Sequence, residues 1–363
     1  MDRLASSALE APDASEESRY PMSSSPGSRA DVDDIPEALP ADLIPIQYHF
    51  NMLNDTARMD GFHRAIEMAV CPGMSVLDLG GGTGVLSHFA AMRGAERVWC
   101  VERLAPLVRA ARAALAESPA GDRVTVVNAD ADTFLPPERV DVVLCEMLHT
   151  GLLRERQIQI IGGFKERYLA RFGLPLPAFV PAATIQAVQP IQQDFEYFGY
   201  TARTPLFQDA RSIQSRTTEL GPPQVFQSFA YDEALPERCE VDGPLAITAS
   251  GTCNAVRIIT KNVLAMSLRT GETAEWLMGY LVIPLPAPIP VRAGDAPVVS
   301  FSYRPGDELD ALTGTISLTR PRIIDVATTN PNLGRFVRNP HESDQVSGSG
   351  GGRLGGGGRL SRD

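Results

Sequence analysis

The stretch Val76–Glu102, VLDLGGGTGVLSHFAAMRGAERVWCVE, decides the fold of this chain. A short apolar run ends in three glycines, apolar side chains then recur with the helical period, and a second β-type run ends in the carboxylate of Glu102. Gly94, between the helical pattern and the second run, is typical of a helix C-terminus. Strand, helix and strand of this length form a parallel crossover unit, so the stretch predicts an α/β fold.

The glycine turn inside this stretch indicates a nucleotide-like ligand. Gly80, Gly82 and Gly84 let a bound molecule approach the backbone, and a carboxylate after the second strand can bind both ribose hydroxyls. A nicotinamide fingerprint has its third glycine or an alanine one position later, where this chain has Val85. Asp78, before the turn, offers a carboxylate to a methionyl ammonium group. We therefore predict S-adenosyl-L-methionine as cofactor; the alternatives are NAD and a purely structural turn.

Composition limits the function classes. The chain has 363 residues, of which 44% are hydrophobic, which is enough for two domains with a sizeable core. Its net charge of −11 argues against a nucleic-acid partner, because binding to phosphates needs a basic surface. We see neither a signal peptide nor an apolar run that could span a bilayer, and we predict a cytoplasmic protein with no membrane partner. Five widely spaced cysteines and five histidines without ligand spacing predict no metal site.

Four segments differ in composition. Residues 1–40 are rich in Ser, Ala, Pro, Asp and Glu and predict a disordered leader. Residues 41–180 carry the alternating pattern of an S-adenosylmethionine-binding, Rossmann-like domain. Residues 181–327 hold short β-type runs between Pro and Gly, which predict an antiparallel β-barrel substrate domain, and residues 328–363 predict a flexible Gly-rich tail. The β-type runs are Thr184–Val188, Val225–Ala230, Ala246–Ala249, Val256–Thr260, Val263–Ser267, Trp276–Val282, Val298–Tyr303 and Leu312–Leu318.

Acidic residues follow the predicted strands of the first domain. Asp78 and Glu102 end the first two strands, Asp130 and Asp132 follow a strand at 123–128, and Glu146 follows a strand at 140–145. The carboxyl ends of parallel strands meet at one edge of a sheet, where such folds bind ligands. We therefore expect these side chains to face one site.

Four segments together carry a family resemblance. They are the motif at 76–102, HFNMLNDTAR at 49–58, CEMLHTGLLRE at 145–155, and AEW at 274–276 followed by LVIPLPAPIPVRAGD. In type, order and spacing they resemble the protein arginine N-methyltransferase family over about residues 48–318. The resemblance implies an α/β fold, with a doubly wound Rossmann-like methyltransferase domain followed by an antiparallel β-barrel domain. It also implies a homodimer.

By resemblance, nine residues would bind the cofactor. They are His49 and Met52 as its lid, Arg58 for the methionine carboxylate, Asp78 for the ammonium group, Gly80 and Gly82 for backbone approach, Glu102 for the ribose, and Asp130 or Asp132 for the adenine amine. Arg58 lies in the first turn of a helix that Asp55 is expected to cap, off the apolar face of that helix.

Glu146 and Glu155 are the predicted catalytic residues. A guanidinium is planar, cationic and protonated in solution, and the methyl donor is a sulfonium cation, so the two repel each other. Two carboxylates gripping the guanidinium offset this repulsion and aim one nitrogen at the methyl group, and one of them can accept the lost proton. The alternative is that both are ordinary loop and helix-cap charges.

Three departures from the family pattern bear on the substrate. Residues 36–47 lack the aromatic segment that covers the family's active site, Met147 replaces a loop tryptophan, and Glu275 replaces a histidine. Glu275 would offer a third carboxylate in the pocket. We therefore predict a small-molecule guanidino substrate such as free arginine. The alternatives are protein arginine and a non-catalytic partner of an active enzyme.

Overall fold

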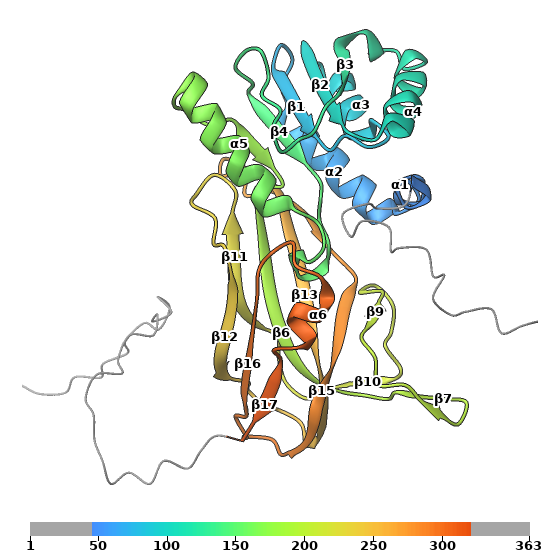
Figure 1. Cartoon of the computed structure of the whole chain (residues 1–363), viewed down its shortest axis with the longest axis vertical. Coiled ribbons are helices and arrows are strands. Elements are labelled where there is room, and N and C mark those ends of the chain that lie inside the picture. Colours follow the sequence, from blue (N-terminus) through green and yellow to red (C-terminus); the bar gives the residue numbers. More distant parts are fainter. Residues whose placement is uncertain (1–45, 321–363) are drawn as a thin grey trace, which may run out of the picture. The chain divides into compact units, whose positions relative to one another are not determined.

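The computed structural model of the protein describes residues 46–320, and the predicted leader (1–40) and Gly-rich tail (328–363) lie outside this range (Figure 1). The helices are α1 (Ile46–Met52), α2 (Thr56–Ala69), α3 (Val85–Met92), α4 (Ala105–Ala116), α5 (Gln157–Phe172) and α6 (Leu309–Thr313). The strands are β1 (Ser75–Leu79), β2 (Arg97–Glu102), β3 (Val124–Asn128), β4 (Val142–Cys145), β5 (Ala178–Val180), β6 (Ala183–Gln193), β7 (Glu196–Tyr197), β8 (Tyr200–Thr201), β9 (Leu206–Gln208), β10 (Thr217–Glu219), β11 (Gln224–Ala230), β12 (Cys239–Pro244), β13 (Gly251–Met266), β14 (Thr273–Leu277), β15 (Tyr280–Val291), β16 (Val298–Tyr303) and β17 (Ser317–Thr319).

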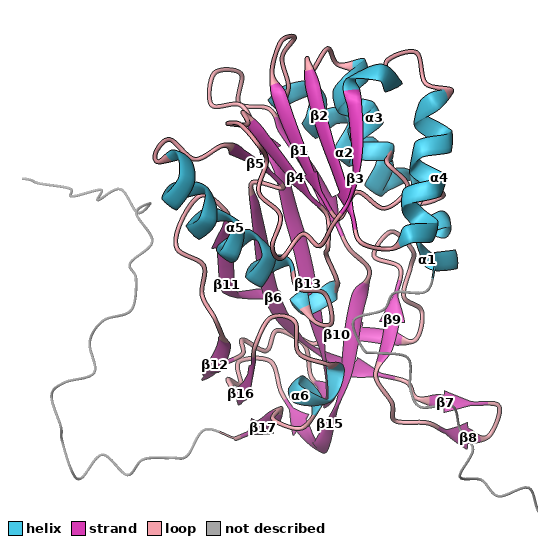
Figure 2. Cartoon of the chain, turned by 45° about the horizontal axis from the view of Figure 1, so that its top comes forward, coloured by secondary structure: helices cyan, strands magenta, loops and turns pink. Residues whose placement is uncertain are grey.

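The first sheet is parallel and has the order β3-β2-β1-β4-β5. The chain extends the sheet on one side of β1 through β2 and β3 and then crosses to the other side at β4. Strands β1 and β4 are almost wholly buried, as expected for parallel strands covered on both faces (Figure 2). The change of direction between β1 and β4 is the position where such sheets bind ligands. The predicted fold class is confirmed here.

The second part of the described chain is antiparallel. A seven-stranded sheet is built on β13, a strand of 16 residues that pairs with β6 on one side and β15 on the other. Strands β12, β16 and β17 form a further three-stranded sheet. The antiparallel architecture agrees with the predicted barrel, while the domain limits at 180 and 327 stay predictions.

Some predicted strands have other limits. Val256–Thr260 and Val263–Ser267 belong to one continuous strand, β13. Trp276–Val282 is divided between β14 and β15, because Met278 and Gly279 leave the ladder. In both places the strand limits are set by hydrogen bonding to a neighbouring strand, which the local sequence pattern does not show.

Two predicted strands are wrong. Ala246–Ala249 is irregular: the Ile247 N–H donates to the Asp295 carbonyl at 3.1 Å, and both residues lie in loops. Leu312–Leu318 begins in α6, where the Gly314 N–H closes a helical turn on Asp310, and only its end belongs to β17. Leu312 is fully buried, so its apolar character reflects packing of a short helix.

Helix α2 packs against both the parallel sheet and the seven-stranded antiparallel sheet. Its N-terminus is capped as predicted, since the Asp55 carboxylate accepts the Arg58 N–H at 3.2 Å. Phe62 is fully buried and meets the Trp276 ring edge to face, with centroids 6.1 Å apart. The contact fixes the first turn of α2 against β14, which positions Arg58.

Residues 196–219 hold short strands. Strands β7 and β8 form a protruding hairpin, and β9 and β10 pair with β15 and β6 (Figures 1 and 2). By resemblance, a dimerisation arm of the arginine methyltransferases would lie at about 197–224, a range that includes most of these short strands. Among the helices of residues 46–320, none is long and apolar enough to cross a membrane.

Candidate active site

A cavity of about 580 Å³ opens at the carboxyl edge of the parallel sheet. Its size falls within the range of about 300–1,000 Å³ usual for small-molecule sites. All eleven residues predicted from the sequence line it: His49, Met52, Arg58, Asp78, Gly80, Gly82, Glu102, Asp130, Asp132, Glu146 and Glu155. The fold therefore brings the two predicted groups, cofactor-binding and catalytic, into one site.

The backbone of the glycine turn adopts left-handed conformations that favour glycine. Gly80 and Gly82 have φ values of +74° and +54°, a region that other residues rarely adopt. Glu102 accepts the Gly82 N–H at 3.0 Å through one oxygen and the Leu104 N–H at 2.7 Å through the other. His49 lies over the turn, because a Cβ built on Gly82 would meet its Nδ1 at 3.5 Å. The turn is thus shaped for close approach of a ligand, with a buried carboxylate beside it.

Asp78 lies beneath this turn. It is 1% exposed and accepts a hydrogen bond from the Ser87 hydroxyl at 2.7 Å. Burial raises the pKa of this carboxyl to about 6, an effect that the Ser87 hydrogen bonds only partly offset. A ligand cation near Asp78 would stabilise the ionised form, in accord with the predicted ammonium partner.

Arg58 is buried in the first turn of α2. Only 5% of the residue is exposed, and its guanidinium forms an ion pair with Glu146. The same group lies 5.1 Å from the centroid of the Trp276 ring. The placement off the apolar face of α2 was wrong, because Arg58 lies one turn before Phe62 on the same buried face. Its role toward a methionine carboxylate stays a prediction.

The two predicted catalytic glutamates have different surroundings. The Glu146 side chain is 10% exposed, and its Oε1 has no hydrogen-bond partner among the described residues. Glu155 is partly buried, and burial raises its pKa to about 7 although Arg58 and Arg154 act in the opposite direction. A buried carboxylate oxygen without a donor, beside a carboxyl of raised pKa, is suited to receive a cationic ligand.

The loop between these glutamates is held at both ends. The Gln157 side chain donates to the Cys145 carbonyl at 2.7 Å and accepts the Met147 N–H at 2.9 Å. In the middle of the loop, the Gly151 N–H donates to Thr260 on β13 at 2.7 Å, and Tyr303 donates to the Gly151 carbonyl at 2.8 Å. The loop is therefore fixed by α5 and by the two antiparallel sheets that contain β13 and β16.

The chain resembles methyltransferases in sequence. Residues 76–164 match the family described as Methyltransferase domain. An uncharacterized protein of Methanothermobacter thermautotrophicus is 32% identical over 272 residues, which cover 74% of this chain and 97% of that protein. The Arginine N(omega)-methyltransferase of Streptomyces achromogenes subsp. streptozoticus is 26% identical over 69% of this chain and 74% of its own length. The chain is a methyltransferase similar to the protein arginine N-methyltransferases.

A solved structure shares the fold of this chain. The Trypanosoma brucei PRMT1 enzyme-prozyme heterotetrameric complex with AdoHcy superimposes with a TM-score of 0.59 and 18% identity, over 72% of this chain and 88% of that chain. The predicted resemblance, the enzyme class and the S-adenosylmethionine cofactor are confirmed. The roles of individual residues in this methyltransferase stay predictions.

The two aspartates predicted for the adenine amine have different surroundings. Asp130 is exposed and accepts the Asp132 N–H at 2.9 Å. Asp132 forms an ion pair with Arg156. Both line the cavity, and the choice between them as adenine ligand stays open.

Glu275 is not in the pocket. Its carboxylate pairs with Lys261 at 2.6 Å, and it is absent from the cavity lining that includes its neighbour Trp276. The expectation of a third carboxylate was wrong because adjacent residues of a strand point to opposite faces. The burial pattern of β14 alternates accordingly, with Trp276 inside and Glu275 outside.

Sequence reasoning missed some cavity-lining residues. Tyr48 lies near Arg58, and burial raises its pKa while the charge of Arg58 acts to lower it. Phe207 comes from β9 and meets the His149 ring edge to face at 5.6 Å. The aromatic character of Tyr48 was a usable signal, whereas Phe207 is far away in the sequence and had none.

The raised pKa of Glu155 predicts a pH dependence. Below pH about 7 this carboxyl is protonated in the free enzyme and cannot pair with a guanidinium. We expect kcat/KM for the guanidino substrate to fall about tenfold per pH unit below that value. The test is initial rates from pH 5.5 to 8.5 at saturating methyl donor. A profile that stays flat between pH 6 and 8 would show that Glu155 does not bind substrate in its ionised form.

Proposed function

We propose that this enzyme transfers a methyl group from S-adenosylmethionine to a guanidino nitrogen of arginine. The observation that carries the proposal is the pair of carboxylates, Glu146 and Glu155, in the cavity that also contains the glycine turn and Glu102. The name of the Streptomyces relative, Arginine N(omega)-methyltransferase, supports the same substrate group.

The residues at the turn fit the cofactor. Gly80 and Gly82 leave backbone uncovered, Glu102 is fixed beside them by two backbone N–H groups, and Asp78 is a buried carboxylate that a cation would stabilise. When bound, S-adenosylmethionine supplies a methyl group on a sulfonium and leaves as the neutral thioether S-adenosylhomocysteine.

The chain's own residues prepare the guanidino nitrogen. Glu146 and Glu155 bind the guanidinium and offset its charge, which lowers the repulsion between two cations. Their hydrogen bonds hold positive charge on the far nitrogens, so the lone pair of the remaining nitrogen becomes available to form the new N–C bond. That nitrogen loses one proton, which Glu155 accepts directly or through water.

The test uses the full chain with a methyl donor carrying a labelled methyl group. Free arginine, an arginine-containing peptide and a cell extract are incubated separately, and methylated products and S-adenosylhomocysteine are measured by mass spectrometry. We expect one labelled methyl group on a guanidino nitrogen per S-adenosylhomocysteine released. Absence of product in all three would favour a non-catalytic partner of another methyltransferase.

A homodimer and a cytoplasmic location are further proposals. The heterotetrameric assembly of the Trypanosoma relative supports an oligomer. The short strands β7 and β8, at the position of the family's dimerisation arm, leave open how two copies would meet.

A further inference from the structure

One segment of the antiparallel part reaches the substrate side of the cavity. Residues 206–219, which we call the strap, consist of β9, a loop and β10. Strand β9 pairs with the start of β15, with Tyr280 opposite Gln208, and β10 pairs with the end of β6. Figures 1 and 2 both place β9 on the same side of the molecule as α1, whose residues line the cavity.

Phe207 brings the strap to the edge of the cavity. Its side chain lines the cavity while 58% of the residue is exposed, so it stands between the interior and solvent. Its ring meets His149, which belongs to the loop between the two catalytic glutamates. Behind it the chain is tightly packed, because a Cβ built on Gly279 would lie 3.1 Å from the Gln208 carbonyl oxygen.

Arg211 connects the strap to the N-terminus of α2. Its guanidinium lies 3.5 Å from a carboxylate oxygen of Asp55, the residue that caps α2 and lines the cavity. Asp209 holds the same guanidinium at 3.2 Å from within the strap. The strap thus starts on the antiparallel sheet and contacts the helix that carries Arg58.

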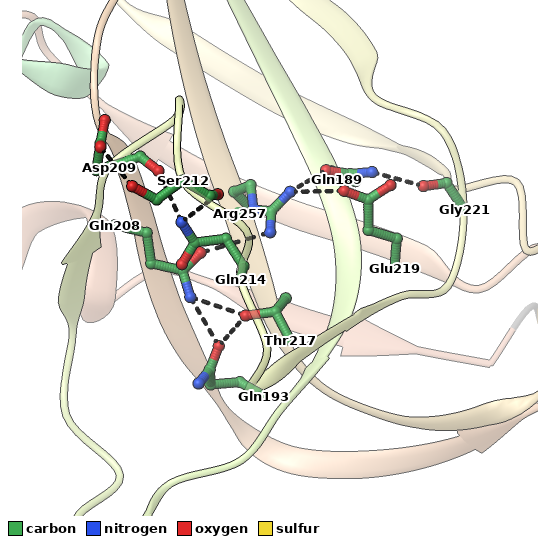
Figure 3. A network of polar contacts seen from close by, with 10 residues as sticks. All are labelled: Gln189, Gln193, Gln208, Asp209, Ser212, Gln214, Thr217, Glu219, Gly221 and Arg257. Atoms are coloured by element: carbon green, nitrogen blue, oxygen red, sulfur yellow. Dashed lines mark hydrogen bonds and ion pairs between the residues drawn. The ribbon is translucent and has the colours of Figure 1, made fainter.

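A buried polar network fixes both ends of the strap (Figure 3). At one end Gln208 donates to Gln193 at 3.0 Å and to Thr217 at 2.8 Å. At the other end Glu219 accepts from Arg257 at 2.9 Å. Arg257 is 3% exposed and also lies 4.4 Å from the centroid of the Tyr280 ring. Because Gln208 and Arg257 are buried in this network, the strap is held as part of the sheet.

The loop of the strap is also ordered internally. Asp209 accepts from the Ser212 hydroxyl at 2.6 Å, and the Gln214 side chain donates to the Asp209 carbonyl at 2.6 Å. Figure 3 shows these contacts around Asp209, next to the network of Gln208 and Arg257. A loop closed on itself in this way keeps Arg211 directed toward Asp55.

We propose that the strap makes the enzyme selective for a free guanidino amino acid over an arginine residue inside a polypeptide. This inference rests on the proposed function. When the guanidinium is bound at Glu146 and Glu155, the α-carbon end of the substrate lies toward Phe207 and Arg211. A polypeptide backbone that extends on both sides of that α-carbon would collide with the strap. Arg211 is already paired with Asp55 and Asp209, so the strap acts on the substrate through its position at the edge of the cavity.

The test compares two substrates: free L-arginine, and arginine in the middle of a peptide with both ends blocked. For the wild-type enzyme we expect kcat/KM to favour free arginine by at least about 100-fold. In the double variant Phe207→Ala/Arg211→Ala we expect this ratio to fall at least about tenfold, mainly through KM. Both side chains are more than half exposed, so the variant is compatible with folding.

A matched control removes the same residue types elsewhere. Phe198 is fully exposed at the tip of the β7–β8 hairpin, and Arg238 pairs with Glu240 on β12. The variant Phe198→Ala/Arg238→Ala should keep the wild-type ratio. Equal use of both substrates by the wild-type enzyme, or an unchanged ratio in the strap variant, would overturn the selectivity while leaving arginine methylation intact. If neither substrate is methylated while S-adenosylhomocysteine binds, the proposed function itself is wrong.

Discussion

Glu146→Gln is expected to lower kcat for arginine methylation about 1,000-fold, in the range seen when one preorganised electrostatic group is removed. The substitution keeps the shape of the side chain and removes its charge, so a bound guanidinium faces the sulfonium with one carboxylate fewer. The buried position makes this loss large, because the Glu146 side chain is 10% exposed and solvent cannot replace it.

Cofactor affinity separates this effect from unfolding. Glu146 touches the predicted cofactor residues through its ion pair with Arg58, so we expect the Kd of S-adenosylhomocysteine, measured by calorimetry, to change by no more than about tenfold, far less than kcat. Glu275→Gln is the matched control, because Glu275 pairs with Lys261 outside the cavity and should keep full activity. Normal turnover in Glu146→Gln would remove this loop from the catalytic site.

The parallel sheet could be predicted from the sequence because local patterns determine it. The run before Gly80 is buried on both faces, the helix after it repeats with the helical period, and β2 ends at Glu102 as expected. The carboxyl edge then follows from topology, which explains why the acidic residues at the strand ends share one cavity.

The antiparallel part was less predictable because its burial depends on distant partners. Asn262 interrupts the apolar pattern of β13, yet it is fully buried and accepts a hydrogen bond from Thr184 on β6 at 2.7 Å. Leu312 is the opposite case: it belongs to a run of residues predicted as a strand, but it lies in the short helix α6 and is buried there. In both cases tertiary contacts override the local pattern.

In the candidate site, too, some features follow from local sequence and others depend on distant contacts. The spacing of Glu146 and Glu155 was informative, but the burial of Arg58 depends on Trp276, which lies on the far β14 strand. Glu275 could have been placed correctly by the alternation of a strand, once Trp276 was assigned to the interior. The strap had no sequence signal, because Arg257 and Gln208 are ordinary polar residues until the sheets bring them together.

Glu102→Ala is expected to weaken S-adenosylmethionine binding about 100-fold or more, since two hydrogen bonds to a charged group contribute about 1.5–3 kcal/mol each and 1.4 kcal/mol is tenfold in affinity. In the structure both carboxylate oxygens already organise the site, one at the Gly82 N–H and one at the Leu104 N–H. Removing the carboxylate therefore takes away the predicted ribose acceptor and also loosens the glycine turn.

The measurement is the Kd of S-adenosylhomocysteine together with the melting temperature, and Glu102→Gln serves as the graded variant because its amide oxygen can still accept one of the two N–H groups. Glu117→Ala, at the exposed end of α4, is the matched control and should bind as the wild type does. If Glu102→Ala lowers the melting temperature without changing affinity, Glu102 only shapes the turn. If affinity falls in Glu102→Ala and in part in Glu102→Gln, the carboxylate both shapes the turn and contacts the ligand, as the two N–H contacts and the position at the end of β2 lead us to expect.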